Sequence, residues 1–473
     1  MGISIFVLCS LCFCSVFGYN TYSYKAAVVD VAKGDFHSGK YADIVYEAAK
    51  LNVDIVVLPS PNDIPSEGAL ELCMNELDNY DEIVKSVSTA AKEGQVYVVA
   101  HLYEKTHCQD KQELIRSNLV FDRRGNIVSV YRKPLNTLSK CNTTMLKSGR
   151  FTTDFGTTFG ILMEEDILLK NASEFDGIKN FILAGSFVPK TSFLFAKQFP
   201  SSWAYVNNVN LITANGIFGG NIDLKSAPNQ LIVAEFNKEA RNDVPRPLTV
   251  TPDSFSTGDF SQYSIKPLDL DASSQGYTDT VCQGTFCCQF YVKASLIGSK
   301  QGITYGLVAF DGTQQLSANY IGVQTCSIVA CAGLYKRSCF VGSENNSTNV
   351  KFEKITINGN FSEDNSAQFP SILTSTQDVF KKENLKFTIQ NKNFKYVTAE
   401  LYNKENVLSF GIFGRVYSRD YDTSEFGRVN NTDGISDFSE YISSENVQEF
   451  FDYLWIRLRI VIFIVSIYVL EMM

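Results

Sequence analysis

The sequence contains few histidines and no excess of basic residues, and both shortages narrow the functions that it can serve. Only three of the 473 residues are histidines, and His37, His101 and His107 form no nucleophile–base pattern. His101 alternates with apolar neighbours inside a predicted strand, so we interpret it as a core or rim residue with satisfied hydrogen bonds. The formal net charge is −9, which leaves no basic face for phosphates, and we expect no nucleic-acid partner.

Apolar stretches of the length that spans a bilayer, about 20 residues, are also missing. The N-terminal run from Ile3 to Phe17 is shorter, and small or moderate residues follow it up to Gly18. The positive charge that usually precedes such a run is absent. The pattern nevertheless predicts a secretory signal peptide over residues 1–18.

The C-terminal apolar run is shorter still. It comprises eleven uncharged residues from Ile460 to Leu470, preceded by Arg457 and Arg459. An acidic, serine-rich polar linker, residues 421–459, leads into the apolar tail, residues 460–473. A removable GPI signal has this order and a hydrophobic tail of about 10–20 residues. A true membrane span and a terminal amphipathic strand or helix remain the alternatives.

The twelve cysteines become nine when the predicted signal peptide is removed, because Cys9, Cys12 and Cys14 lie within it. In an oxidising compartment most of the nine should be paired, and the odd number leaves one free or intermolecular. No histidine follows Cys108, so we expect disulfides rather than a metal site, and no cofactor is indicated. The disulfide candidates, six of which cluster in the second half, are Cys73, Cys108, Cys282, Cys287, Cys288, Cys326, Cys331 and Cys339.

Asparagines in Asn-X-Ser/Thr sequons fit a chain that passes through the secretory pathway. Two of them, Asn345 and Asn346, overlap, so we expect only one of the two to be used. The predicted glycosylation sites are Asn142, Asn171, Asn345, Asn346, Asn360 and Asn430.

The first half of the chain alternates between strand and helix patterns. Short β-branched runs predict buried strands, and apolar residues three and four apart predict amphipathic helices between them. In chain order we expect a strand at Tyr24–Val31, a helix at Lys40–Asn52, a strand at Val53–Ser60, a helix at Asn79–Gly94 and a hairpin at Ser117–Pro134. This alternation predicts a layered α/β domain over residues 24–237.

The composition changes after Asn237. Residues 238–265 carry three prolines in the stretch "KEARNDVPRPLTVTPDS" and show little periodicity, which predicts a linker. From residue 266 to 420, short alternating strands separated by turn residues predict a mainly β second domain.

Several segments resemble one known family in sequence, order and spacing. In the first half these are "YKAAVVD", "VVAHLYEKTHC", "SNLVFDRRGNIVSVYRKPLN" and "NLITAN". In the second half they are "VCQGTFCCQFYV", "YGLVAFDG", "QTCSIVACAGLYKRSCF" and "INGNFS". From Tyr24 to Asp420 the chain resembles the vanin/biotinidase branch of the nitrilase, or carbon–nitrogen hydrolase, superfamily. The resemblance implies an α/β fold, a four-layer αββα nitrilase-type sandwich followed by a mainly β, disulfide-containing base domain.

The superfamily that the chain resembles works with a glutamate, a lysine and a cysteine. The thiolate attacks an amide carbonyl, the carboxylate moves the proton, and the ammonium stabilises the oxyanion. By position, the resemblance matches the lysine to Lys133 in "VYRKPLN". It places Ser60 where the glutamate is expected and Glu164, in "FGILMEED", where the cysteine is expected. Asp166 is the ordinary family residue, and Glu165 takes the place of an aromatic residue.

Glu164, at the position of the family nucleophile, could act as a substitute nucleophile or as the ion-pair partner of Lys133. A carboxylate that attacked an amide would form an anhydride, which is far less stable than a thioester, so we do not expect catalysis by Glu164. An inserted residue near Thr157 would shift the alignment by one and still supply no cysteine. Cys141 lies in a polar loop, which favours a disulfide or a spare thiol over catalysis. We expect instead that Glu164 neutralises Lys133, because an unpaired buried ammonium is costly; Glu165 is left without a role.

The sequence therefore predicts a secreted or surface-anchored glycoprotein of the vanin/biotinidase type without amidase activity. Its role would be binding, either of a small amide-like ligand in the former active-site pocket or of a secreted protein through the base domain. The alternative is an active amidohydrolase that cleaves linear carbon–nitrogen bonds of pantetheine-like or biotin-like amides with rearranged residues. A purely structural secreted protein is a third class, and the low-complexity sequence that would favour it is not evident.

Overall fold

The computed structural model describes residues 22–29, 38–60, 82–108, 111–134, 149–163, 165–175, 177–185, 199–214, 216–219, 225–226, 231–239, 261–297, 304–316, 319–331, 339, 349–363, 365–374, 384–391 and 394–422. The predicted signal peptide (1–18), most of the predicted linker (238–265), the acidic segment beyond Asp422 and the apolar tail (460–473) lie outside these residues. Among the described helices, none is both long and apolar enough to cross a bilayer.

The first domain is built on a seven-stranded sheet with the strand order β11-β12-β1-β2-β3-β4-β5. β1, β2 and β3 run parallel to one another. β4 pairs antiparallel with β3 on one side and with β5 on the other. The predicted hairpin is confirmed as β4 and β5, and Gly125 in its turn has a φ of 82°, which suits glycine. The strands are β1 (Ser23–Val29), β2 (Ile55–Val57), β3 (Tyr97–Cys108), β4 (Lys111–Phe121), β5 (Ile127–Pro134), β11 (Lys225–Ser226) and β12 (Leu231–Asn237).

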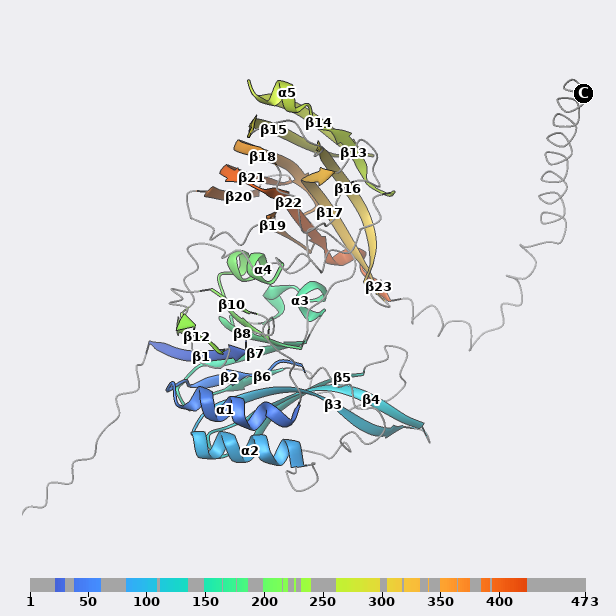
Figure 1. Ribbon diagram of the computed structural model, residues 1–473. Helices are drawn as coiled ribbons and strands as arrows, with labels where there is room; N and C mark the ends of the chain where they lie inside the picture. Colours follow the sequence, from blue (N-terminus) through green and yellow to red (C-terminus); the bar gives the residue numbers. More distant parts are fainter. Residues whose placement is uncertain are drawn as a thin grey trace, which may run out of the picture. The chain divides into compact units, whose positions relative to one another are not determined.

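Two helices, α1 (Tyr41–Ala49) and α2 (Glu82–Gly94), cover one face of this sheet (Figure 1). We call it the helix face. α1 buries Tyr41, Val45 and Ala48, which recur at helical spacing. These side chains share a core with strand residues of the same face, among them Leu102 and Val130. The predicted strand–helix–strand alternation thus forms as expected in this layer.

The opposite face of the sheet, which we call the inter-sheet face, packs on a five-stranded sheet with the order β10-β9-β8-β7-β6. On the outer side of this second sheet lie α3 (Asp166–Leu169) and α4 (Phe199–Asn207), as Figure 1 shows. The strands are β6 (Arg150–Thr152), β7 (Thr158–Met163), β8 (Asn180–Ala184), β9 (Asn210–Thr213) and β10 (Gly216–Phe218). The layers helix, sheet, sheet and helix confirm the predicted αββα sandwich.

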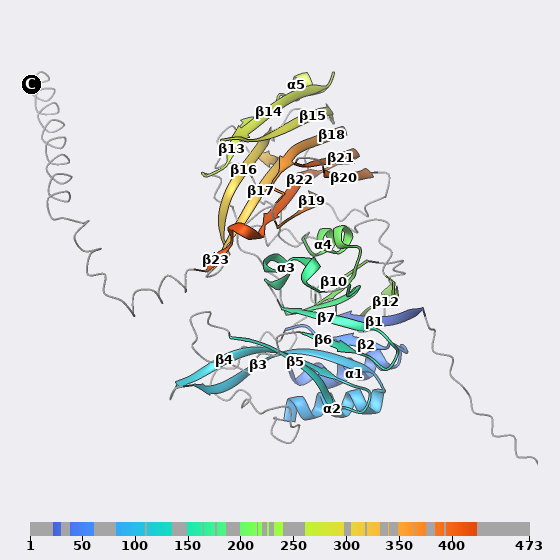
Figure 2. The same ribbon diagram turned by 180° about the vertical axis from the view of Figure 1, so that it is seen from behind.

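The second domain packs two antiparallel sheets face to face (Figure 2). One has the order β13-β16-β17-β22-β19 with β23 beside β17, and the other has the order β14-β15-β18-β21-β20. Phe290 and Ile355 from one sheet meet Ile328 and Phe410 from the other in a shared core. The strands are β13 (Ser264–Pro267), β14 (Tyr277–Gln283), β15 (Phe286–Leu296), β16 (Thr304–Leu316), β17 (Asn319–Cys331), β18 (Val350–Phe361), β19 (Ser366–Thr374), β20 (Leu385–Asn391), β21 (Lys395–Glu405), β22 (Val407–Val416) and β23 (Tyr421–Asp422).

Disulfides staple this domain where the cysteines cluster. The described pairs are Cys282–Cys287, Cys288–Cys326 and Cys331–Cys339. The first joins β14 to β15, the second crosses between the two sheets, and the third closes the end of β17. These pairs confirm the prediction for the six clustered candidates. Cys73, Cys141 and the side chain of Cys108 lie outside the described residues.

Arg415 of β22 connects the second domain to the first, and its side chain is completely buried. Its Nε donates to the carbonyl oxygen of Leu168 in α3 at 2.9 Å, and its Nη2 lies 2.5 Å from the Asp420 carboxylate. Its Nη1 donates to the carbonyl oxygen of Gly322. Leu168 follows Asp166 by two residues, so a side chain of the second domain holds the turn that follows β7.

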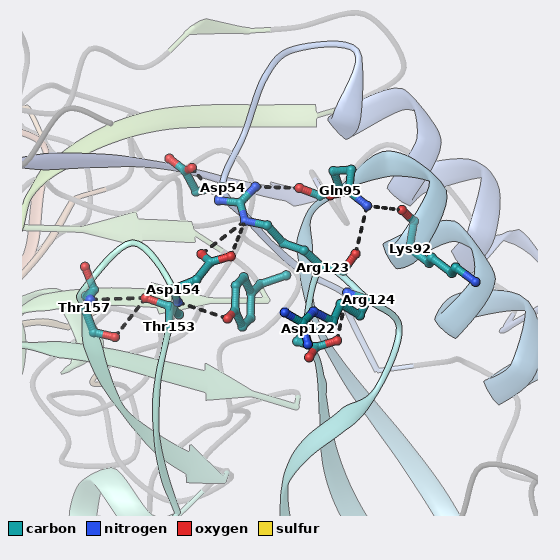
Figure 3. Close-up of polar contacts among 10 residues, drawn as sticks. Asp54, Lys92, Gln95, Asp122, Arg123, Arg124, Thr153, Asp154 and Thr157 are labelled. Carbon is teal, nitrogen blue, oxygen red and sulfur yellow. Dashed lines mark hydrogen bonds and ion pairs between the residues drawn. The ribbon is translucent and has the colours of Figure 1, made fainter. Parts of the chain in front are cut away.

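Arg123, in the turn of the β4–β5 hairpin, connects the two sheets of the first domain (Figure 3). Its Nη2 lies 2.8 Å from Asp54 beside β2, and its Nε lies 3.1 Å from Asp154 in the β6–β7 turn. Its Nη1 donates to the carbonyl oxygen of Gln95, and its guanidinium lies 5.8 Å from the centre of the Tyr97 ring. These contacts join the β4–β5 turn of the first sheet to the β6–β7 turn of the second sheet.

Candidate functional site

The candidate site lies where β3, β4 and β5 face the end of β7. Antiparallel register places two rows of side chains next to each other there, Tyr103–Arg116–Lys133 and His101–Asn118–Tyr131. Residues paired directly across neighbouring strands point to the same face of a sheet, and so do residues two apart along one strand. Tyr131 belongs to the core between the sheets, so both rows point to the inter-sheet face.

The centre of the site is the carboxylate of Asp166, which is 1% exposed. Lys133 donates to its Oδ1, and the Tyr131 hydroxyl donates to its Oδ2 at 2.8 Å. The backbone amide of Met163 also donates to Oδ2, at 2.9 Å, and the Lys170 ammonium lies 3.7 Å from Oδ1. Burial, followed by the nearby Asp166 charge, raises the pKa of Tyr131 well above its ordinary value. Tyr131 therefore stays protonated and keeps donating to Asp166.

Glu165 has a partner that was not predicted from the sequence. Its Oε2 lies 3.7 Å from Nη1 of Arg116, whose side chain is 8% exposed. The carbonyl oxygen of Glu165 accepts bonds from the amides of Leu168 and Leu169, which begins α3. Glu165 thus brings a carboxylate to a buried guanidinium.

His101 is completely buried beside this cluster. Its Nδ1 lies 2.7 Å from Oδ1 of Asn118, and Nδ2 of Asn118 donates to the carbonyl oxygen of Leu162 at 3.3 Å. Since the Asn118 oxygen faces the imidazole, Nδ1 is the ring nitrogen that carries the proton. Burial lowers the pKa of His101 to about 4. The prediction of a satisfied core residue is therefore half right, because Nε2 has no hydrogen-bond partner among the described groups.

A second buried ion pair lies on the helix face of the same strands. Nε of Arg132 lies 2.9 Å from Oε2 of Glu104, and the two side chains are 6% and 0% exposed. Arg132 pairs across strands with Ser117 of β4, which in turn pairs with Leu102 of β3. Leu102 packs in the core with α1 and α2, so Arg132 points to the same helix face. Arg132 and Lys133 are consecutive, so β5 sends one cation to each face of the sheet.

The structure describes two of the three residues predicted to occupy the catalytic positions. Lys133 lies in the cluster, Ser60 is half-buried just after β2, and Glu164 lies outside the described residues. β3 and β4 separate β2 from β5 in the sheet. The expected Lys133–Glu164 pair is therefore untested, and the partner that the structure gives to Lys133 is Asp166.

Sequence reasoning missed the partners of these residues, Arg116, Tyr131 and Lys170. The one available signal was a charge inside an otherwise apolar strand, as at Arg116 in "ELIRSNLVF". The cluster can neutralise and orient its own charges and can offer polar groups to a ligand. Among the described residues, no thiol lies in it, and no group of three or more metal-binding side chains was found.

Comparison of the amino-acid sequence with known protein families gives one match in each of the two domains. Residues 37–173 match the family described as carbon-nitrogen hydrolase, and residues 254–420 match the vanin C-terminal domain. Vanin-like protein 1 of Drosophila melanogaster is 25% identical, over 84% of this chain and 85% of that one. Pantetheinase of Sus scrofa is 24% identical, over 72% of this chain and 71% of that one.

Among solved structures, Nit3 of Saccharomyces cerevisiae, a member of the nitrilase superfamily, shares 18% identity over 46% of this chain and 90% of that one, with a TM-score of 0.33. That likeness is too distant to add to the argument. The two family matches lie in the order that the αββα domain and the β domain have in the structure, and together they span more than half of the chain. The chain belongs to the vanin branch of the nitrilase (carbon–nitrogen hydrolase) superfamily.

Proposed function

We propose that this protein is a non-catalytic vanin-like homologue that works by binding. The observation that supports the proposal is the position of Lys133, the retained family lysine, whose ammonium is committed to Asp166. That carboxylate is buried and accepts two further hydrogen bonds, from Tyr131 and from the Met163 amide. Turning the ammonium toward a substrate would leave the buried Asp166 carboxylate with less of its compensation, which costs about 1–2 kcal/mol while its other partners remain.

The need to compensate the charge of Lys133 also gives Ser60, at the position expected for the glutamate, a consequence for the site. A hydroxyl carries no charge, so it cannot neutralise Lys133 as the expected glutamate would, and it is a poor proton acceptor at neutral pH. With Glu164 in the place of the thiol, the predicted nucleophile position holds no group that forms a thioester. We therefore propose that the chemistry has been lost while the pocket framework has been kept.

The proposed ligand is a small amide-like molecule held in the former active-site pocket, and the proposed alternative partner is a secreted protein bound through the base domain. We further propose that the protein is secreted or displayed on the outer face of the plasma membrane, with the apolar C-terminal tail as a GPI signal. The disulfides of the second domain support this location, because such bonds persist in oxidising compartments. The acidic net charge of −9 supports the absence of a nucleic-acid partner.

The test is an amide-hydrolysis assay with a pantetheine-type amide, run beside a pantetheinase as the active control. We expect no turnover by the purified wild-type protein and a rise in its Tm when the amide is present. The triple variant Ser60→Glu, Glu164→Cys, Glu165→Phe is the matched gain-of-function control. Wild-type turnover that disappears in Lys133→Ala would overturn the proposal and establish an amidohydrolase instead.

A further inference from the structure

Two of the sequon asparagines, Asn171 and Asn360, lie in the described residues, and their surroundings differ. Asn360 is exposed on β18, whereas Asn171 is half-buried at the start of the 3₁₀ turn Ala172–Phe175. A glycan attached to Nδ2 needs room outside the fold and gains stability when it finds an apolar surface to cover. The two sites can be compared on both points.

Asn360 points to the outer face of its sheet. Its neighbour Phe361 is 1% exposed and points into the core, so Asn360 points away from the core because side chains alternate along a strand. It is paired directly with Tyr396 of β21, which places the two side chains about 5 Å apart at their Cβ atoms. Tyr396 is 36% exposed, and Phe394, two residues before it, is 61% exposed. A sequon and two exposed aromatic rings thus share one corner of this sheet.

Asn171, by contrast, uses its side chain inside the fold. Its Nδ2 donates to Oδ1 of Asn365 in the second domain at 3.2 Å. Its Oδ1 accepts a bond from the Ser173 amide at 3.2 Å, and its backbone amide donates to Glu174 at 2.9 Å. A sugar bonded to Nδ2 would displace the contact with Asn365.

We propose that Asn360 carries an N-linked glycan whose first sugar packs on the ring of Tyr396, and that Asn171 is kept unmodified as part of the contact between the domains. This rests on the proposed secretory route. The bond between Nδ2 of Asn360 and C1 of the sugar forms, and the bond from C1 to the pyrophosphate of a lipid-linked oligosaccharide breaks. The amide loses one proton, and the lipid pyrophosphate leaves.

The packing follows from the chemistry of the two surfaces. The C–H groups on one face of a pyranose ring carry a small positive charge, and the face of an aromatic ring is negative. An exposed aromatic ring beside the attachment point therefore gives the first sugar a surface that excludes water. The glycan accounts for large apolar side chains that would otherwise remain in solvent at this corner.

Occupancy is tested on the full chain, produced in a eukaryotic secretory host. Peptide N-glycosidase treatment in ¹⁸O water converts glycosylated asparagine to labelled aspartate, which is read by peptide mass spectrometry. We expect label at Asn360 and none at Asn171. Ser362→Ala should abolish the label at Asn360, while Ser173→Ala, the matched control, should leave it. Neither change removes a described hydrogen bond, because Ser362 and Ser173 form theirs through backbone atoms.

Label at other sequons but not at Asn360, or label at Asn171, would overturn this proposal alone. A chain with no label at any sequon would overturn the proposed secretory route together with it, and the binding function would be unaffected.

The packing is tested by stability. Removing the glycan should lower the Tm of the wild-type protein by about 2 °C. The same treatment should have much less effect on Tyr396→Ala, whereas Tyr396→Phe, which keeps the ring, should behave like the wild type. Equal shifts in all three proteins would overturn the packing on Tyr396.

Discussion

The two faces of the seven-stranded sheet use neighbouring cations of β5 for different purposes. On the helix face, Arg132 pairs with Glu104 of the same sheet, at 6% and 0% exposure. On the inter-sheet face, Lys133 pairs with Asp166 of the next sheet, at 20% and 1% exposure. The first pair ties β5 to β3 inside one sheet, and the second holds the turn after β7. One position along a strand therefore decides whether a cation stabilises the domain or shapes the site.

The largest expected effect comes from breaking the helix-face pair. Glu104→Ala should lower the free energy of unfolding by about 3–5 kcal/mol, because the Arg132 guanidinium loses its carboxylate in a buried place. Urea denaturation of the wild type and the variant measures the loss. The double variant Glu104→Leu, Arg132→Met is the control and should recover much of the stability. A loss below about 1 kcal/mol in the single variant would contradict the buried pair.

The next effect belongs to the inter-sheet face and depends on pH. The pKa of His101 is lowered to about 4 in the folded protein, whereas an unfolded histidine titrates near 6.5. The unfolded chain binds the proton first, so stability falls as the pH drops from about 6.5 to about 4 and is unaffected by His101 above that range. The loss approaches about 3 kcal/mol.

His101→Gln removes this titration and is the comparison for the pH series. Unfolding free energies at pH 7, 5.5 and 4.5 should diverge between the two proteins, with the wild type losing more. Parallel curves would show that the imidazole is not held neutral in the folded state.

Breaking the inter-sheet pair should cost less than breaking the helix-face pair. Lys133→Met leaves Asp166 with the Tyr131 hydroxyl, the Met163 amide and the more distant Lys170 ammonium, so we expect a loss of about 1–2 kcal/mol in urea denaturation. Asp166→Asn is the matched variant, and its cost should exceed that of Lys133→Met because the carboxylate has more partners. The reverse order would mean that the lysine, rather than Asp166, is the centre of the cluster.

The smallest effect is expected for Glu165. Its carboxylate is 26% exposed and lies 3.7 Å from Arg116, so Glu165→Gln should change the free energy of unfolding by about 0.5 kcal/mol. Raising the salt concentration should reduce the difference between the two proteins. A loss of 2 kcal/mol or more would place Glu165 among the buried pairs.

The strands and helices could be predicted from the sequence because their signals are local. The β-branched runs, the helical spacing of Val45 and Ala48 and the turn around Gly125 each depend on a few consecutive residues, and the structure forms them as expected. The cysteine cluster was readable for a related reason, since its six members lie within one short region. The family motifs located Lys133, but they said nothing about what the ammonium would contact.

The side-chain contacts of the site could not be predicted from the sequence, because the packing of separate layers brings the contacting residues together. Glu165 was left without a role until β7 was seen to end beside Arg116 on β4. Arg415 lies 247 residues from Leu168, whose carbonyl oxygen it binds. No periodicity connects such positions, because strand register and the angle between sheets are set by the whole core.

By itself, the amino-acid sequence determined the alternation of strands and helices and the disulfide-rich second domain, and it predicted a lysine whose family glutamate and cysteine are replaced. Only the tertiary structure decided that Lys133 is paired with Asp166, that Arg132 serves the opposite face and that Asn360 lies beside an exposed Tyr396. The physical reason is that hydrophobic periodicity is encoded within one element, whereas ion pairs and surface neighbours arise from how elements pack on one another.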